Sequence, residues 1–461
     1  MTTRAPLISQ VPVDGAALRT LAARAPEDFP VFCDSAAQGP LARFSLLAAA
    51  PVASITRDRH GGLEAQNVEL VPGSFLDNLD AWARPTRPAG NNAQSLPFIG
   101  GWFVYLGYEL AAEIEPRLKL PPADAPWSAF ALRVTSLAVH DLASDRVLAV
   151  TEDGDPHAHE TLVARLVDAG RDTPPDPLPL RLARLDEDPP QRFLEQVRAA
   201  KEHIAAGDIY QANLSRSWRL KLADDADACR VYDALRAANP APFAARVTWR
   251  GYSLLSSSPE RLLRISGRDI STRPIAGTRA RQVTKEGGSA QQDRADTAEL
   301  VQHPKERAEH IMLIDLERND LGRVCEAGSV KVDEYMVTES YAHVHHIVSN
   351  VRGRLRADAS AVDALRALFP GGTITGCPKV RCMEIIAELE GAGRGAYTGS
   401  LGWLGSDGDA DFNILIRTLT QRGAEIELRA GAGIVADSIP ERELEETRAK
   451  ARGMLRAFVA A

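Results

Sequence analysis

The segment DFNILIRTLTQRGAEIELRAGAGIV, residues 411–435, constrains the fold more strongly than any other part of the sequence. Apolar and polar residues alternate along it, which is the period of a strand with one buried face. The dipeptide Arg-Gly at 422–423 is a reversal signal between two alternating runs. The segment therefore predicts an antiparallel hairpin. Strict alternation also places Arg417 on the same strand face as Leu415 and Leu419.

Two glycine-rich stretches imitate nucleotide-binding motifs. Residues 431–436, GAGIVA, match the GxGxxA pattern of a dinucleotide site, but Ser-Ile-Pro at 438–440 delays the helix that this motif requires. In GGTITGCPK, residues 371–379, Cys-Pro-Lys stands where a phosphate loop has Lys followed by Ser or Thr. We therefore expect neither an NAD site nor a nucleoside triphosphate site.

The composition indicates a globular protein that acts on a small ligand. The 461 residues are 44% hydrophobic and carry a net charge of -8, without a dense basic run that would suggest nucleic acid or an anionic membrane as partner. No apolar run is long enough to span a bilayer and no signal peptide is evident, so we expect a cytoplasmic protein. Neither a disulfide framework nor a zinc site is expected, because the five cysteines are scattered without CxxC spacing: Cys33, Cys229, Cys325, Cys377 and Cys382.

The chain divides into two regions at a proline-rich segment. Residues 1–180 form a region whose short strand-like runs, mainly between about 30 and 170, predict a β-rich structure. The prolines of the segment RDTPPDPLPLRLARLDEDPPQRF, residues 171–193, make a helix or a central strand improbable, so we interpret it as a linker or crossing segment. Residues 190–461 form the second region, which alternates helices with hairpins.

Four helices are predicted in the second region. The first begins near residue 191, with apolar residues at helical spacing and Gly207 as its C-terminal stop. The others are DTAELVQHPKERAEHIMLIDLERNDL, CPKVRCMEIIAELE and PERELEETRAKARGMLRAFVA. Ser438 is the candidate N-cap of the last helix, and Pro440 is tolerated in its first turn.

The stretch TRPIAGTR, residues 272–279, predicts a special turn between two strands. Pro274 fixes φ, and Gly277 permits a positive φ or the close approach of another group. Between them Ala276 offers only a methyl group, so binding here has to come from backbone amides and the Thr278 hydroxyl.

Two pairs of glutamates have the spacing of one helix face. Glu306 and Glu309 lie three residues apart, as do Glu443 and Glu446, and Lys450 follows one turn later. Two such pairs facing each other would form an oxygen-rich site suited to Mg2+. The alternative is two solvated helix faces carrying ordinary i,i+4 ion pairs.

Arg417 and His346 are two further candidates. A guanidinium among leucines needs an anionic partner, either a substrate carboxylate held bidentately or a buried Asp or Glu. His346, in the alternating run AHVHHIVSNV, is either a histidine of the core or a functional one.

Taken together, these stretches resemble the chorismate-utilising enzymes, the family of the synthase components for anthranilate and for 4-amino-4-deoxychorismate. The resemblance rests on the following motifs, in family order across residues 190–455: SSPERLL, TRPIAGTRAR, HPKERAEHIMLIDLERNDLGRV, AHVHHIVSNVRG, FPGGTITGCPKVRCMEIIAELE, RGAYTGSLGW, DFNILIRTL and GAGIVADSIPERELEETRAKA. It implies an α+β fold in which two antiparallel β-sheets pack orthogonally, with helices outside, as one interlocked unit.

The resemblance also assigns roles to site residues. It implies Mg2+ as cofactor and chorismate as substrate. Glu309 and Glu446 resemble the metal ligands, and Glu306 and Glu443 the residues that hold the waters of the metal or lie close by. The other matching positions are substrate-binding or catalytic candidates: Tyr397 and Arg417 at the ring carboxylate, the amides of Gly431 and Gly433 near it, Lys450 at a carboxylate, and Gly277, Thr278 and His346 beside the reacting ring.

Gln211 predicts that the nucleophile is ammonia. Family members that add water have a lysine at this place, which acts as the general base that a weak nucleophile needs. No glutaminase-sized segment is present, so the resemblance implies a separate glutamine amidotransferase subunit that supplies ammonia within a heterodimer.

The motifs disagree on the product. Anthranilate synthases have PIAGT, as here, whereas aminodeoxychorismate synthases commonly have PIKGT, with a lysine thought to attack the ring. In contrast, FPGGTITGCPK is closer to the aminodeoxychorismate synthase motif, and ARFSLLAAAP replaces the LLES segment with which anthranilate synthases bind tryptophan. The leading hypothesis is aminodeoxychorismate synthase component I, for 4-aminobenzoate and folate synthesis. Anthranilate synthase component I is the alternative, and a catalytically silent chorismate-binding subunit is a third hypothesis.

Overall fold

The computed structural model describes residues 4–37, 39, 41–86, 96–172, 179–224, 226–280, 304–340 and 344–460. Within these ranges, the side chains of residues 276–280, 304–306, 340, 344–345 and 460 are not part of the description. Thr278 and Glu306 are therefore placed by their backbone alone.

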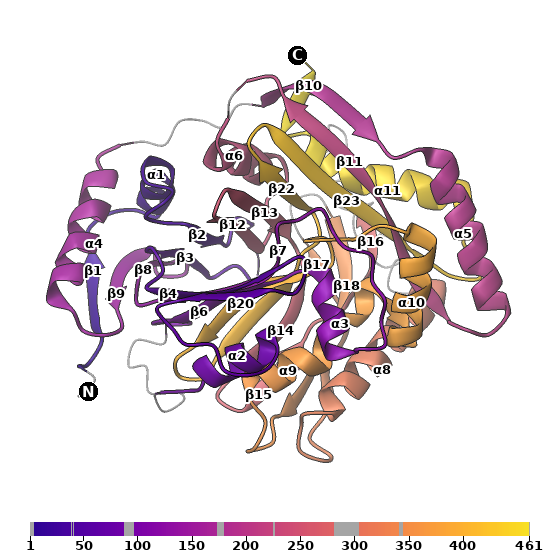
Figure 1. Ribbon diagram of the computed structural model, residues 1–461, viewed down its shortest axis with the longest axis horizontal. Coiled ribbons are helices and arrows are strands. Elements are labelled where there is room, and N and C mark those ends of the chain that lie inside the picture. Colours follow the sequence, from indigo (N-terminus) through magenta and orange to yellow (C-terminus); the bar gives the residue numbers. More distant parts are fainter. Residues whose placement is uncertain are drawn as a thin grey trace.

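Two large sheets, almost entirely antiparallel, form the centre of the molecule (Figure 1). In the described part of the chain the first sheet has 13 strands. Their order is β1 (Leu7–Val11), β9 (Arg146–Thr151), β8 (Ser136–Asp141), β3 (Phe44–Ala48), β2 (Val31–Asp34), β12 (Phe243–Trp249), β13 (Tyr252–Ser258), β22 (Thr418–Arg422), β23 (Glu425–Ile434), β11 (Gln211–Leu222), β10 (Leu180–Glu187) and β24 (Phe458–Ala460), with β19 (Gly376–Cys377) paired to β11. The β10–β24 pair is parallel.

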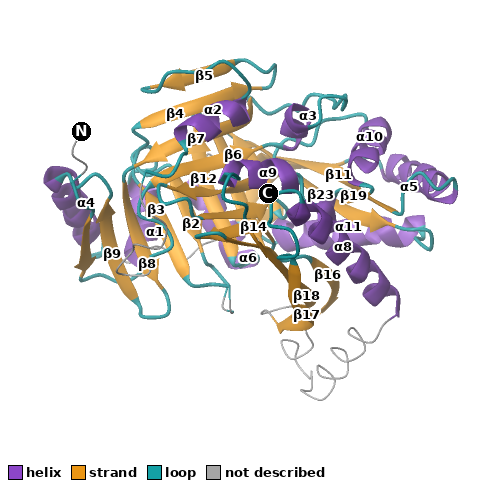
Figure 2. Cartoon of the chain, turned by 90° about the horizontal axis from the view of Figure 1, so that it is seen from below, coloured by secondary structure: helices purple, strands orange, loops and turns teal. Residues whose placement is uncertain are grey.

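The second sheet has 11 strands in the same described part of the chain. Their order is β16 (Ile275–Ala280), β18 (Val344–Arg354), β15 (Asp269–Thr272), β14 (Arg261–Ser266), β21 (Ala410–Ile414), β20 (Ser400–Gly405), β6 (Gly101–Leu106), β7 (Trp127–Val134), β4 (Ala53–Asp58) and β5 (Leu63–Gln66), with β17 (Lys331–Ser340) paired to β18. Seen from below, β16, β17 and β18 lie beside α8 (Pro304–Gly322) at one edge (Figure 2).

Helices cover the outer sides of the sheets. In the first region these are α1 (Ala16–Arg24), α2 (Phe75–Trp82), α3 (Ala111–Ile114) and α4 (Pro156–Ala169), with the 3-10 helix η1 (Tyr108–Leu110). In the second they are α5 (Pro190–Ala205), α6 (Ala228–Ala238), α8, α9 (Ala361–Leu368), α10 (Lys379–Glu390) and α11 (Pro440–Leu455), with η2 (Gly372–Ile374). Helices α1 and α4 lie at one end of the first sheet, and α5, α10 and α11 at the other (Figure 1).

The two regions expected from the sequence share both sheets. Strands β1, β2, β3, β8 and β9 continue into β12 of the first sheet, and β4 to β7 continue from β20 of the second. One hydrophobic core joins them, because Val31 and Phe103 of the first region belong to the same buried cluster as Val247, Leu254 and Leu401 of the second. The antiparallel two-sheet α+β fold is therefore confirmed, and the regions 1–180 and 190–461 are interlocked.

The proline-rich segment contains a strand, so its interpretation as a linker was wrong in part. Strand β10 lies between β11 and β24, away from the sheet edge. Pro179 precedes this strand, and Pro189 and Pro190 follow it. Because the prolines flank the strand, none of them removes a hydrogen bond from its ladder.

Most other elements agree with the sequence. The hairpin β22–β23 has the predicted reversal. Gly207 follows α5 with a φ of 81°, as predicted for a helix stop. Ser438 is not the N-cap of α11, since Ile439 occupies that position and the Ser438 hydroxyl instead accepts a hydrogen bond from the Val435 N–H.

The five cysteines are free, which agrees with the sequence. Within the described ranges, no helix is both long and apolar enough to cross a membrane.

Candidate active site

The centre of the candidate site lies where two neighbouring strands pass from one sheet to the other. Strands β13 and β22 are paired in the first sheet, and their continuations β14 and β21 are paired in the second. The two crossings run side by side, since the Ser257 N–H donates to the Arg417 carbonyl at 3.0 Å and the Ile414 N–H donates to the Glu260 carbonyl at 3.0 Å. This pairing places Glu260 and Arg417 in the same corner of the molecule.

Arg417 does not continue the alternation of Leu415 and Leu419, so that prediction was wrong. Strand β21 ends at Ile414, and Arg417 has a φ of 51°, in the left-handed region, where the chain bends to enter the first sheet. Burial lowers the pKa of the Arg417 guanidinium, and the charge of Glu260 opposes this effect. The guanidinium therefore needs an anion nearby, as the sequence predicts.

Glu260 is a buried carboxyl that the sequence analysis missed as a site residue. Burial raises its pKa to about 7, although the Thr373 hydroxyl, the Ile275 N–H and the charges of Arg417 and Lys450 favour its ionised form. The Thr373 Oγ1 donates to Glu260 Oε1 at 2.7 Å. A carboxyl that titrates near neutral pH beside a cationic group can donate a proton to a bound substrate.

Two glycines on β23 leave room above the first sheet. Gly431 is paired with Ser215 of β11, and Gly433 with Asn213. A Cβ at Gly431 would lie 2.5 Å from the Tyr397 Oη, so a side chain here would displace the tyrosine. The Asn213 Nδ2 donates to the same Tyr397 Oη at 3.4 Å. Tyr397, Gly431 and Gly433, predicted as one substrate subsite, are therefore brought together.

Gln211 lies at the start of β11, next to Glu309 of α8. Its Nε2 donates to Glu309 Oε1 at 3.4 Å. A Cβ at Gly433 would lie 2.6 Å from the same Nε2, which explains why glycine stands there. Gln211 is buried, and its Oε1 has no hydrogen-bond partner within the described part of the chain.

Helix α11 brings Lys450 and two of the predicted metal ligands to β23. The Lys450 Nζ lies 2.8 Å from Glu446 Oε1 and donates to the Gly431 carbonyl at 2.9 Å. Glu443 is buried on the same helix. The helix thus supplies a cation and two carboxylates beside the glycine pair.

Glu309 of α8 and Glu446 of α11 therefore lie near the same stretch of β23. Carboxylate oxygens are the donors that Mg2+ prefers, so this set fits the metal chemically. Among the described side chains, no three His, Cys, Asp or Glu residues converge closely enough to hold a metal ion, and the side chain of Glu306 lies outside the description. The metal-binding role of the four glutamates stays a prediction.

The segment TRPIAGTR forms a connection followed by a strand, where a single turn was predicted. Strand β15 ends at Thr272 and β16 begins at Ile275, so only two residues make the connection. The β16–β18 register shifts between Ala276 and Thr278, and Thr278 is paired with His346. The backbones of these two residues therefore lie side by side, while their place beside a reacting ring stays a prediction. The Ile275 N–H ties this strand to Glu260.

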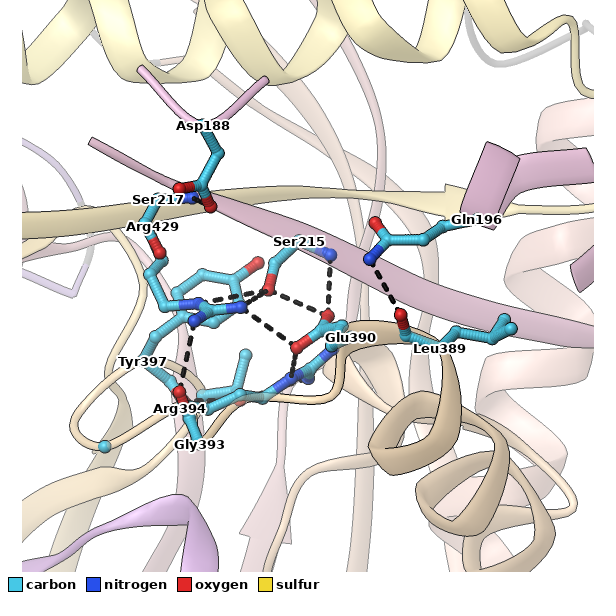
Figure 3. A network of polar contacts seen from close by, with 12 residues as sticks. Asp188, Gln196, Ser215, Ser217, Leu389, Glu390, Gly393, Arg394, Tyr397 and Arg429 are labelled. Atoms are coloured by element: carbon cyan, nitrogen blue, oxygen red, sulfur yellow. Dashed lines mark hydrogen bonds and ion pairs between the residues drawn. The ribbon is translucent and has the colours of Figure 1, made fainter. Parts of the chain in front are cut away.

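A network of ion pairs lies beside Tyr397, with the Arg394 guanidinium over the tyrosine ring (Figure 3). Glu390, the last residue of α10, accepts from Arg394 Nη2 at 2.6 Å, from Arg429 Nη2 at 3.0 Å and from the Ser215 N–H at 2.8 Å. Burial would raise the pKa of Glu390, but the two guanidinium groups overcome this and hold it below its usual range. No periodic pattern in the sequence predicts this network, because its members come from separate elements.

The network reaches several segments that carry candidate residues. Arg394 Nη2 donates to the Asn213 carbonyl at 2.6 Å, and Arg394 Nη1 donates to Thr398 Oγ1 at 3.3 Å, next to Tyr397. On its outer side the network borders a cavity of about 830 Å³ that also reaches Tyr397. The network thus holds together the segments that carry Asn213 and Tyr397, which lie at the predicted carboxylate subsite.

Comparison with known proteins agrees with this geometry. The family model of the chorismate binding enzymes matches residues 36–456. Aminodeoxychorismate synthase component 1 of Bacillus subtilis (strain 168) is 38% identical over 435 residues, covering 90% of this chain and 89% of that protein. Anthranilate synthase component 1 of Methanothermobacter thermautotrophicus is 40% identical over 421 residues, covering 91% and 86%.

A solved structure shares the whole fold. The crystal structure of anthranilate synthase component I from Streptococcus pneumoniae TIGR4 superimposes with a TM-score of 0.78 at 32% identity, covering 90% of this chain and 92% of that one. Matches of this extent in sequence and in structure show that the chain belongs to the chorismate binding enzymes.

Proposed function

We propose that the chain is component I of an aminodeoxychorismate synthase, which converts chorismate to 4-amino-4-deoxychorismate for 4-aminobenzoate and folate synthesis. The observation that carries amination is Gln211, a neutral amide buried beside Glu309. An amide cannot act as the general base that water would need, whereas ammonia is already a competent nucleophile. The FPGGTITGCPK loop, whose Thr373 binds Glu260, favours this product over anthranilate.

The two carboxylates of chorismate match the cations of the site. Arg417 and Tyr397 bind the ring carboxylate, with the backbone near Gly431 beside them, and Lys450 holds a second carboxylate oxygen. Glu260, in its acid form, gives a proton to the departing hydroxyl, which leaves as water. The added ammonia gives up one proton, so the net reaction exchanges a hydroxyl for an amine.

Mg2+ completes this site in the proposal. Glu309 and Glu446 would bind it, with Glu306 and Glu443 holding its waters or lying close by. When bound, the metal supplies positive charge that neutralises a substrate carboxylate. The carboxylates of this chain would hold that charge beside β23.

A glutamine amidotransferase subunit is the proposed source of ammonia, in a heterodimer with this chain. The relatives from B. subtilis and M. thermautotrophicus are themselves named as components of synthases, which supports a second subunit here. Free ammonium at alkaline pH is expected to replace that subunit. Cytoplasmic synthesis fits a protein with free cysteines.

Anthranilate synthase component I is the second candidate, and Ala276 favours it. Without a lysine at this position, covalent attack by this residue is excluded, and ammonia would add directly to ring carbon 2 with loss of pyruvate. The M. thermautotrophicus relative and the S. pneumoniae structure both carry the anthranilate synthase name.

The test is to incubate the purified chain with chorismate, Mg2+ and ammonium at about pH 8.5 and to follow products by mass and fluorescence. We expect a non-fluorescent aminated chorismate that a lyase converts to 4-aminobenzoate. Anthranilate fluorescence with pyruvate release would establish the second candidate instead. Chorismate binding without turnover would establish the silent subunit.

The metal assignment has its own test. Glu309→Gln and Glu446→Gln are expected to abolish magnesium-dependent turnover, because each removes a charged donor. The matched controls are Asp315→Asn on α8 and Glu445→Gln on α11, which are exposed and paired with nearby arginines. Wild-type rates in Glu309→Gln or Glu446→Gln would overturn the assignment.

A further inference from the structure

Thr398 follows Tyr397 in the loop between α10 and β20, and its backbone conformation is unusual. Its φ is 62°, in the left-handed region, which a β-branched residue rarely adopts because its side chain crowds the backbone. Such conformations persist where the surrounding contacts impose them, and they are concentrated at functional sites. Thr398 is only 1% exposed, so the contacts around it hold this conformation.

The backbone of Thr398 is bonded to the segment that leads to Arg417. The Thr398 N–H donates to the Leu415 carbonyl at 2.8 Å, and the Leu415 N–H donates to the Gly399 carbonyl at 2.8 Å. Arg417 lies two residues after Leu415 and also has a positive φ, of 51°. The two left-handed residues therefore lie in segments that hydrogen-bond each other, and each segment carries one residue of the proposed ring-carboxylate subsite.

The side chain of Thr398 joins Tyr397 to the ion-pair network. The Thr398 hydroxyl donates to the Tyr397 carbonyl at 2.5 Å and accepts from Arg394 Nη1 at 3.3 Å. The Arg394 guanidinium lies over the Tyr397 ring, 5.6 Å from its centroid, and donates to Glu390 Oε1 at 2.6 Å. Thr398 thus contacts both the backbone of Tyr397 and the cation over its ring.

The start of the same loop is held by the first region of the chain. Glu109 Oε1 accepts from the Arg394 N–H at 2.6 Å, and the Tyr108 N–H donates to the Gly395 carbonyl at 2.8 Å. The loop is therefore bonded on both sides of Tyr397. Because both ends are held, the backbone angles at Thr398 determine where Tyr397 points.

We propose that Thr398 is a positioning residue that sets Tyr397 beside Arg417, so that the two can grip one carboxylate. The inference rests on the proposed function, in which Tyr397 and Arg417 bind the ring carboxylate of chorismate. It adds that an unfavourable backbone conformation fixes the shape of this subsite before the substrate arrives. A subsite that is already in its bound shape binds more tightly, because less conformational freedom is lost on binding.

The first test is a calorimetric titration with chorismate and Mg2+, in the absence of ammonium, of the wild type, Thr398→Val and Thr398→Ser. Valine keeps the size and branching of threonine but lacks the hydroxyl, so the Kd for chorismate is expected to rise about 3- to 10-fold. Thr398→Ser keeps the hydroxyl and is expected to bind as the wild type does. In turnover with ammonium, Thr398→Val is expected to raise KM with little change in kcat.

The matched control is Ser400→Ala, which removes another fully buried hydroxyl two residues further along, one that donates to the Asn413 carbonyl at 2.5 Å. This variant is expected to lower the melting temperature and to leave the Kd unchanged. A Thr398→Val protein whose Kd equals that of the wild type or of Ser400→Ala would overturn the inference alone. A wild type that binds no chorismate would overturn the proposed function, and the inference with it.

A double-mutant cycle separates action through Tyr397 from a direct effect on the substrate. Tyr397→Phe keeps the ring but removes the hydroxyl that Thr398 would position. In this background, Thr398→Val is expected to cause little further rise in Kd. The same fold-change in both backgrounds would overturn the proposal.

The role of the backbone is tested by comparing Thr398→Ala with Thr398→Gly. Both variants lack the hydroxyl, and only glycine adopts a positive φ without strain. We expect Thr398→Gly to melt at the higher temperature and yet to bind chorismate more weakly, because the loop gains freedom. A glycine variant that melts below the alanine variant, or binds more tightly than it, would overturn the proposed role of the left-handed conformation.

Discussion

Glu390 and Glu260 are buried to nearly the same degree, with 3% and 5% of each residue exposed, yet their carboxyls behave in opposite ways. The pKa of Glu390 is held below its usual range and that of Glu260 is raised to about 7. Glu390 has two guanidinium groups in direct contact. Glu260 has a hydroxyl, an amide and the more distant charges of Arg417 and Lys450.

The difference shows that partners decide the charge of a buried carboxyl when burial is equal. A carboxylate held by two arginines stays ionised and acts as a structural anchor. A carboxyl with neutral partners keeps its proton near neutral pH and is available for chemistry. In the proposed function the same side chain therefore serves the scaffold in one place and the reaction in the other.

The largest expected effect concerns Glu260, the carboxyl with the raised pKa. Glu260→Gln removes the proton donor but keeps its shape and its capacity to accept hydrogen bonds. We expect kcat to fall roughly 100- to 10,000-fold, with a smaller change in the KM for chorismate. Product formation measured by mass, with circular dichroism to verify folding, checks the prediction. A folded variant with wild-type kcat would exclude Glu260 as the acid.

Glu390→Gln tests the structural carboxyl, which is paired with Arg394 and Arg429. It leaves two buried guanidinium groups without their anion, so the free energy of unfolding is expected to fall by about 3–5 kcal/mol. Urea titration at pH 7 measures this loss, and Glu384→Gln, a less buried glutamate of the same helix, is the control. A loss below about 1 kcal/mol would mean that Arg394 and Arg429 find other partners.

The pH dependence of this loss follows from the sign of the shift. The pKa of Glu390 is lowered from 4.5, so its contribution is fully present above that pH and declines as pH falls through its folded-state pKa. The stability difference between the wild type and Glu390→Gln is therefore expected to narrow below about pH 4.5. A difference that stays constant into the acid range would contradict the lowered pKa.

Arg417→Ala removes the cation that faces Glu260 and the substrate. The loss of a charge-assisted hydrogen bond, about 1.5–3 kcal/mol, predicts a KM for chorismate roughly 10- to 100-fold higher. Steady-state kinetics at saturating ammonium separate this effect from kcat. An unchanged KM would assign Arg417 to the scaffold, alongside Arg394.

The smallest expected effect comes from removing a neutral partner of Glu260, the Thr373 hydroxyl, so that no charge is lost. Thr373→Val deletes the hydroxyl that lowers the pKa of Glu260, so this pKa is expected to rise and the alkaline limb of kcat/KM to move to higher pH by about half a unit. A limb that moves to lower pH would mean that the hydroxyl stabilises the protonated form of Glu260.

The periodicity of apolar residues predicted the regular elements, because apolar residues recur on the buried face of a helix or strand. Helix α10 and the hairpin β22–β23 lie where the sequence pattern places them, with one buried face each. The motifs of the resemblance predict Tyr397 and Gly431 in one substrate subsite, and the structure places the two residues side by side. Local signals of this kind suffice when the neighbours of a residue belong to the same element.

Residues at sheet crossings were harder to predict. Arg417 follows an alternating pattern in sequence, yet the chain leaves one sheet and enters the other at that point. Glu260 follows a proline and resembles a solvated loop residue, but the neighbouring crossing and the Thr373 loop bury it. Their environments depend on segments more than 100 residues away, which a local pattern does not report.

The paired crossings also have a mechanical consequence. Arg417 and Glu260 sit on the two hinges of backbone that tie neighbouring strands of one sheet to neighbouring strands of the other. The Ser257–Arg417 and Ile414–Glu260 backbone hydrogen bonds hold one crossing to the other, so the two crossings form a single unit. A substitution that distorts either crossing is therefore expected to disturb strands of both sheets at once.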